Sequence, residues 1–263
     1  MKKSSLLLAL CLCASSALLA SPVDPESRNV QPSIPEIAKA GYQLAWSDEF
    51  NGSGLDNQKW GYRTDSKWGS TQKLENVTLS GGNLHLNVKK EEAQGKPHSG
   101  AGVISKMTFQ YGYYEARFKV PQASGWHTSF WMQKYDNSGG TSPKAAHQEL
   151  DVCENDSAEP SNYRVNVHKW ISPHVLYCEL KPINTPDLSR DFHVFACEFT
   201  PKSVKFFFEG ALVKTVDATQ FKHGDQNIWL TTIANTEGVD DAKLPAAAVY
   251  DYVRFFKKTT PAK

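Results

Sequence analysis

Residues 147–156 read His-Gln-Glu-Leu-Asp-Val-Cys-Glu-Asn-Asp and place three carboxylates within six residues, at Glu149, Asp151 and Glu154. Successive side chains of a β-strand point to opposite faces, so Glu149 and Asp151 would share one face. Glu154 would lie on the other face, where burying a carboxylate without a partner is costly. One additional residue in a β-bulge at Val152-Cys153 would return Glu154 to the face of the other two. We therefore predict a bulged strand here.

The chemistry of this stretch follows from the spacing of its acids. Hydrolysis of a glycosidic bond with retention requires a carboxylate nucleophile and a carboxylic acid about 5 to 5.5 Å apart. Glu149 and Glu154 would supply that pair, and Asp151 between them would raise the proton affinity of the acid. Two other interpretations stay open, namely a solvated strand face and a cation site formed by His147, Glu149 and Asp151.

The rest of the chain predicts an all-β fold. Its 263 residues suit one large β domain, and short β-forming runs alternate with turn signals without long helical periodicity. Two packed antiparallel sheets, a sandwich or jelly roll, are the expected architecture. Hairpin turns are expected at Gly81-Gly82 and Glu209-Gly210. The predicted strands cover residues 42–46, 74–79, 84–88, 103–107, 113–120, 128–133, 149–154, 163–170, 175–180, 192–199, 204–208, 211–216, 228–233 and 249–256.

One predicted strand has two different faces. Tyr114, Ala116 and Phe118 form an apolar face of the run over residues 113–120, whereas Tyr113 and Glu115 belong to a polar and aromatic face. We expect the polar and aromatic face to line a groove.

The first forty residues predict export. Residues 1–20 have a Lys2-Lys3 start, an apolar stretch and small residues at the end, as in a secretory signal peptide. Residues 21–40 contain four prolines and predict a leader with little fixed structure. The domain is expected over residues 41–259, in a secreted or periplasmic protein.

Charge and cysteines restrict the partners. The net charge is +1 and no basic run is present, so we expect neither nucleic-acid binding nor membrane insertion. A monomer is a separate expectation. Cys153, Cys178 and Cys197 remain after removal of a signal peptide. A disulfide between Cys178 and Cys197 is one possibility, and the spacing does not suggest zinc.

The stretch from Glu149 to Glu154 resembles the bulged Glu-x-Asp-x-x-Glu signature of the laminarinase- and agarase-type branch of glycoside hydrolase family 16. The resemblance extends over about 215 residues in the order of that family. It includes Trp46-Ser47-Asp48-Glu49-Phe50, Gly81-Gly82-Asn83-Leu84, Ile104-Ser105-Lys106, Tyr111-Gly112-Tyr113-Tyr114-Glu115-Ala116-Arg117 and Asp251-Tyr252-Val253-Arg254.

The resemblance implies a curved jelly roll with a concave substrate cleft and retaining endo-hydrolysis of a β-linked polysaccharide, without a catalytic cofactor. It implies Glu149 as the nucleophile, Asp151 as its assistant and Glu154 as the general acid and base. It also suggests His168 near the catalytic acid. Three tryptophans are candidates for stacking on sugars, although each could equally belong to the core: Trp126, Trp131 and Trp170.

Glu49 and Asp251 lie where some members of the family hold a structural calcium ion, so a calcium site is a further expectation. The alternative is that both are ordinary surface acids.

Departures from the family pattern weaken a β-1,3-glucan assignment and keep a second substrate class open. Trp126-His127-Thr128 replaces the frequent Trp-Pro-Ala, and residues 135–146 lack a Trp-Pro-rich loop. We expect a β-1,3- or β-1,3/1,4-glucan first, and agar-, carrageenan- or host-type galactosyl glycans as the alternative. A transglycosylase would use the same acids. A lectin-like binder would not need them.

Overall fold

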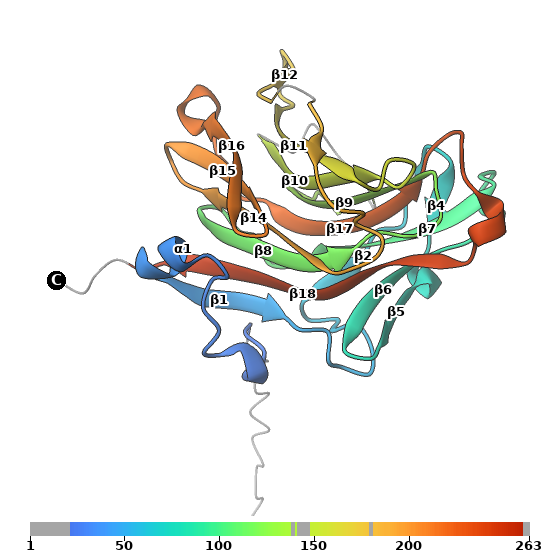
Figure 1. Ribbon diagram of the computed structural model, residues 1–263, viewed down its shortest axis with the longest axis horizontal. Coiled ribbons are helices and arrows are strands. Elements are labelled where there is room, and N and C mark those ends of the chain that lie inside the picture. Colours follow the sequence, from blue (N-terminus) through green and yellow to red (C-terminus); the bar gives the residue numbers. More distant parts are fainter. Residues whose placement is uncertain (1–21, 138–139, 141–147, 179–180, 260–263) are drawn as a thin grey trace, which may run out of the picture.

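Two curved β-sheets pack face to face in the computed structural model, which describes residues 22–137, 140, 148–178 and 181–259 (Figure 1). The predicted signal peptide and His147 therefore lie outside the described residues. No helix among the described residues is long and apolar enough to span a membrane. The predicted all-β sandwich is confirmed.

The first sheet, called the outer sheet here, has eight strands in the order β16-β15-β14-β8-β18-β6-β5, with β1 also paired to β18. Its strands are β1 (Tyr42–Asp48), β5 (Val77–Ser80), β6 (Asn83–Val88), β8 (Gly112–Lys119), β14 (His193–Phe199), β15 (Ser203–Phe208), β16 (Ala211–Asp217) and β18 (Ala246–Lys258).

The second sheet, called the cleft sheet, has ten strands in the order β12-β11-β10-β9-β17-β7-β4-β3, with β13 paired to β11 and β2 to β7. It lies on the inner side of the curve in Figure 1. Its strands are β2 (Trp60–Tyr62), β3 (Ser66–Lys67), β4 (Ser70–Gln72), β7 (His98–Ser105), β9 (Trp126–Gln133), β10 (Glu149–Asp156), β11 (Asn162–Lys169), β12 (Val175–Leu176), β13 (Ile183–Asn184) and β17 (Asn227–Ala234).

The core between the sheets follows from the alternation of side chains along each strand. Leu84 and Leu86 of β6 are fully buried, as are Phe118 of β8, Phe130 of β9 and Leu150 of β10. These residues belong to one apolar cluster that joins the two sheets. The described helical elements are short and add little to it: η1 (Pro25–Ser27), α1 (Pro35–Lys39), η2 (Leu74–Asn76), η3 (Ala218–Gln220) and η4 (Asp241–Lys243).

Strand β7 begins five residues earlier than the sequence predicted. Its sequence contains Gly100 and Gly102, and a Cβ atom added at Gly100 would lie 2.4 Å from the carbonyl oxygen of Thr232. The glycine thus allows β17 to approach closely, although glycine in a sequence argues against a strand. This stretch also contains an exception to the antiparallel expectation, because β4 pairs with β7 in parallel.

The expectation of an unstructured leader over residues 21–40 is wrong for its described part. Ile34 and Ile37 are 5% and 6% exposed and pack against Tyr42 and Phe256 of the outer sheet. Asp24 forms an ion pair with Lys59. The described part of this segment therefore packs on the domain.

The same segment explains a second wrong expectation. The polar face of β8 does not line a groove, because Tyr113 and Glu115 are both fully buried. One carboxylate oxygen of Glu115 accepts the backbone N–H of Ser33 at 3.0 Å, and the other accepts the hydroxyl of Tyr252 at 3.0 Å. Residues 22–40 and neighbouring tyrosines cover this face.

The three described cysteines do not form a disulfide. Cys153, Cys178 and Cys197 are all free and buried. The pairing of Cys178 with Cys197, one of the possibilities left open by the sequence, is therefore absent, and both side chains pack in the core as small apolar groups.

The packing of the N-terminal segment predicts a stability effect. Ile37→Ala should lower the free energy of unfolding by about 2–3 kcal/mol, because it removes buried methyl and methylene groups and leaves a cavity. Urea unfolding followed by tryptophan fluorescence measures it. Leu212→Ala, at a side chain that is 56% exposed, is the control and should change stability by less than about 0.5 kcal/mol. Equal stability of the two variants would contradict the docking of this segment.

Candidate active site

Strand β10 contains the predicted bulge. Against β9, Asp151 pairs with Trp131 and Cys153 pairs with Phe130, so Val152 has no partner. Against β11, three steps from Asp151 to Glu154 correspond to two steps on the neighbour. The additional residue restores Glu154 to the face of Glu149 and Asp151.

All three carboxylates line one open cavity of about 250 Å³ on the cleft sheet. Strand alternation selects the residues that surround them, since every second residue of β9 lines the cavity: His127, Ser129, Trp131 and Gln133. His168 and Trp170 contribute from β11 and the residue just after it. Arg63, Lys67 and Trp68 come from β3 and the segments beside it.

Glu149 is held by hydrogen-bond donors from both neighbouring strands. Its Oε2 accepts the side-chain amide of Gln133 and the indole N–H of Trp170, the latter at 3.0 Å. Its Oε1 lies 3.8 Å from Nε2 of His168. These donors favour the ionised carboxylate, which is the form that a nucleophile needs.

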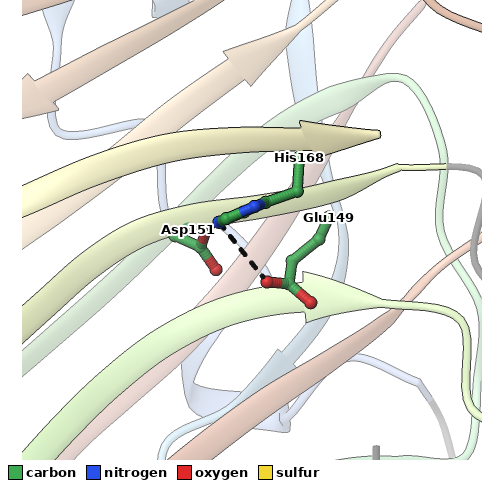
Figure 2. A group of neighbouring side chains, drawn as sticks. All are labelled: Glu149, Asp151 and His168. Carbon is green, nitrogen blue, oxygen red and sulfur yellow. Dashed lines mark ion pairs between the residues drawn. The ribbon is translucent and has the colours of Figure 1, made fainter. Parts of the chain in front are cut away.

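Asp151 is the most enclosed of the three acids, and its side chain is 4% exposed. Its Oδ2 lies 3.2 Å from Nε2 of His168, and Figure 2 shows the imidazole above both Asp151 and Glu149. Burial raises the pKa of Asp151 well above its usual range, and the charge of Glu154 adds to this shift. Asp151 therefore holds a proton readily.

Burial and the charge of Asp151 both act on the protonation of Glu149. Burial raises the pKa of Glu149 well above its usual range, and the next cause is the negative charge of Asp151, whereas His168 and Trp170 act in the opposite direction. A proton on Asp151 would remove the repulsion between the two carboxylates. Glu149 would then keep its two N–H donors without a negative charge beside it from Asp151, and both changes favour its ionised form.

Glu154 has a different environment. Its Oε1 lies 3.4 Å from Nε2 of His127. Burial acts to raise the pKa of Glu154, but the contact with His127 and the charges of His127, His168 and Arg164 outweigh it and lower the pKa. An acid with a lowered pKa releases its proton readily, and it stays protonated over a narrower pH range.

The three predicted tryptophans do not share one location. Trp131 lines the cavity, stacks on Trp229 with ring centroids 4.7 Å apart and donates its N–H to Thr231. Trp170 also lines the cavity. Trp126 is fully buried and packs with Val88 and other apolar residues, so its assignment as a sugar-stacking residue is wrong. It is five residues from Trp131 on one regular strand and therefore points to the opposite face.

The two acids proposed for calcium have other partners. Both oxygens of Glu49 accept hydrogen bonds from Arg254, at 2.9 and 2.7 Å, and Asp251 pairs with Arg117 at 2.5 Å. Each carboxylate thus has a positive partner from the chain itself, and the pair does not fit a calcium site, which requires several free oxygen ligands.

One other group among the described residues has metal-ligand character. Glu149, Asp151 and His168 offer three potential ligand atoms within 4.8 Å of one another. The sequence had suggested His147 in place of His168, and His147 lies outside the described residues. Because these groups are the acids of the cleft, a cation bound there would occupy the site of the reaction.

Sequence reasoning missed His127, Gln133 and Trp68 as site residues. Trp68 is 42% exposed, and its ring meets that of His127 edge to face at 5.2 Å. His127 and Gln133 could have been found, because they have the same strand parity as Trp131. Trp68 follows a strand of two residues, and no local signal places it at the cleft.

A β-sandwich whose open cleft places three carboxylates in different surroundings is the arrangement of a carboxylate-dependent glycoside hydrolase. A family model described as "Beta-porphyranase A-D, GH16 domain" matches residues 42–258. The chain belongs to family 16 of the glycoside hydrolases, as the resemblance of its sequence implied.

Individual relatives share between 24% and 28% sequence identity with this chain. A beta-glucanase of Rhodothermus marinus is 28% identical over 244 residues, which cover 82% of this chain and 85% of that protein. The keratan-sulfate endo-1,4-beta-galactosidase of Sphingobacterium multivorum is 26% identical over 295 residues, covering 98% of this chain and 68% of that protein. The solved structure of the laminarinase from Rhodothermus marinus superposes with a TM-score of 0.71 at 24% identity, covering 83% of this chain and 98% of that one.

The contact between His127 and Glu154 predicts a pH effect. His127→Ala should move the alkaline limb of kcat/KM to higher pH, because His127 lowers the pKa of Glu154 and its loss lets that pKa rise. The measurement is a pH profile on any hydrolysed polysaccharide. His85→Ala, on β6 of the outer sheet, is the control and should retain the wild-type profile. An unchanged or acid-shifted limb in His127→Ala would show that His127 does not act on the catalytic acid.

Proposed function

We propose that the chain cleaves internal β-glycosidic bonds of a polysaccharide with retention, through Glu149 as nucleophile and Glu154 as general acid and base. The observation that supports these roles is the difference in the surroundings of the two acids. Glu149 has two N–H donors and a proton-holding neighbour in Asp151, whereas Glu154 faces His127.

The reaction would proceed in two displacements. An oxygen of Glu149 bonds to the anomeric carbon as the glycosidic C–O bond breaks, and the departing oxygen takes the proton of Glu154. The ionised Glu154 then takes a proton from water, whose oxygen displaces Glu149 from the same carbon. Two inversions restore the β-configuration, and the proton on Asp151 keeps the charge beside Glu149 low throughout.

Two substrate classes have support. A β-1,3- or β-1,3/1,4-glucan was the first expectation, and the beta-glucanase relative favours it. A β-linked galactan is favoured by the galactosidase relative, by the description of the family model and by the positively charged Lys67 in the cleft. Lys67 lines the cavity with its Nζ 5.7 Å from the ring of Trp68. An aromatic face beside a cation suits a sugar that carries an acidic group, so we place an anionic galactan first.

The site of action and the oligomeric state are also proposals. The predicted signal peptide over residues 1–20 supports a secreted or periplasmic enzyme. We propose a monomer, which size-exclusion chromatography with light scattering can test.

A substrate panel tests the proposed function. Wild-type protein should release reducing ends from a sulfated or unsulfated β-galactan or from a β-glucan, in the form of oligosaccharides of several lengths. Glu149→Gln should lower kcat by roughly 10⁴-fold or more while leaving the fold intact, since the covalent step is lost. Substantial turnover by the folded variant would show that Glu149 is not the nucleophile.

Proton NMR of early products distinguishes the mechanism. The first anomeric signal should be that of the β-anomer, and initial appearance of the α-anomer would contradict a double displacement. Products longer than the starting oligosaccharide would identify transglycosylation as the main reaction.

A further inference from the structure

Three nearly parallel aromatic rings form a stack at one side of the cleft, in which the imidazoles of His168 and His174 lie side by side over the indole of Trp170. His168 stacks on Trp170 with ring centroids 4.9 Å apart, and Trp170 stacks on His174 at 4.3 Å, all within 8° of parallel. His168 and Trp170 line the cavity. His174 lies outside it, on the exposed hairpin between β11 and β12.

The two ring nitrogens of His168 face different partners. Its Nε2 lies 3.2 Å from Oδ2 of Asp151 and 3.8 Å from Oε1 of Glu149, so a hydrogen on this nitrogen would point at the two acids. In the neutral imidazole the other nitrogen, Nδ1, is then an acceptor. Nδ1 lies 3.0 Å from Nε2 of His174, which would donate to it in this tautomer.

His174 contacts the two side chains that approach Glu149 from β11 and the residue after it. The ring of His174 forms a hydrogen bond with the imidazole of His168 and packs on the indole of Trp170, whose N–H donates to Glu149. The ring of His174 itself does not reach the carboxylates in this chain of contacts. Loss of such a support lets a catalytic group move from its productive position.

We propose that His174 is a positioning residue that fixes the tautomer of His168 and the plane of Trp170, and through them the placement and charge of Glu149. This role rests on the proposed function of Glu149. The titratable groups that face His168 are Glu149 and Asp151 from β10 and His174 from the hairpin. Of these, Glu149 and Asp151 line the cavity, whereas His174 lies outside it.

Three variants separate the two contacts of His174. His174→Ala removes both the hydrogen bond and the stacking, His174→Phe keeps an aromatic ring on Trp170, and His174→Asn keeps an N–H donor for His168. We expect kcat to fall about 10- to 100-fold in the Ala variant, with smaller losses in the other two and little change in KM. The acidic limb of kcat/KM should move to higher pH in the Ala variant, since His168 then stabilises ionised Glu149 less well.

Ile171→Ala is the matched control, because Ile171 lies on the same hairpin and is 43% exposed. It should retain wild-type kcat and the wild-type acidic limb. Equal losses of kcat in Ile171→Ala and His174→Ala would show that the hairpin as a whole, and not the histidine, supports the site. Wild-type kinetics in His174→Ala would also overturn the proposal.

A readout without substrate separates this inference from the proposed function. Nitrogen-15 NMR of the histidines in the unliganded protein should show His168 protonated at Nε2 with Nδ1 as an acceptor, and this pattern should be lost in His174→Ala. An unchanged His168 spectrum would overturn the inference whether or not the enzyme cleaves the expected polysaccharides. Conversely, failure of the wild-type protein on the whole panel would overturn only the function.

Discussion

One additional residue in β10 is the constraint on which the active site depends. Without the bulge after Asp151, the strand would place Glu154 in the apolar core beside Leu150, where a carboxylate would lack partners. With it, Val152 has no partner on β9 and Glu154 returns to the cleft. The bulge thus concentrates three acids on one surface and makes their mutual repulsion the central electrostatic problem of the site.

The neighbouring strands solve that problem from two sides. Strand β9 supplies Gln133 to Glu149 and His127 to Glu154, and β11 supplies His168 to Asp151 and Glu149. Each contact depends on register, because a shift by one residue would turn these side chains into the core. The broad sandwich packing therefore contributes to catalysis by fixing which residue of β9 and β11 faces which acid.

Much of this arrangement could be predicted from the sequence, since it depends on local rules. The alternation of Leu84 and Leu86 predicts β6, the Gly81-Gly82 pair predicts its hairpin, and the spacing of the acids predicts the bulge. The location of Trp126 was mispredicted even though the same alternation separates it from Trp131. An odd spacing of five residues on one strand is enough to place the two rings on opposite faces.

Other features depend on contacts that have no local signal. Ile34 and Ile37 pack on residues far away in the chain, and their proline-containing segment resembles a flexible leader until the surface it covers is known. The same is true of the first half of β7, where Gly100 allows close packing on β17. His174 likewise becomes relevant only through the fold of the hairpin that places it against His168 and Trp170.

The most direct test of the account is to locate the covalent intermediate. Glu154→Ala, given a β-glycoside of the cleaved sugar with a leaving group that needs no proton, should form the glycosyl-enzyme and hydrolyse it slowly, because the base that activates water is absent. Intact-protein mass spectrometry should show the mass of one glycosyl unit, and peptide mapping should place it on Glu149. Release of the leaving group without a covalent adduct, or an adduct on another residue, would contradict the assignment of these carboxylates.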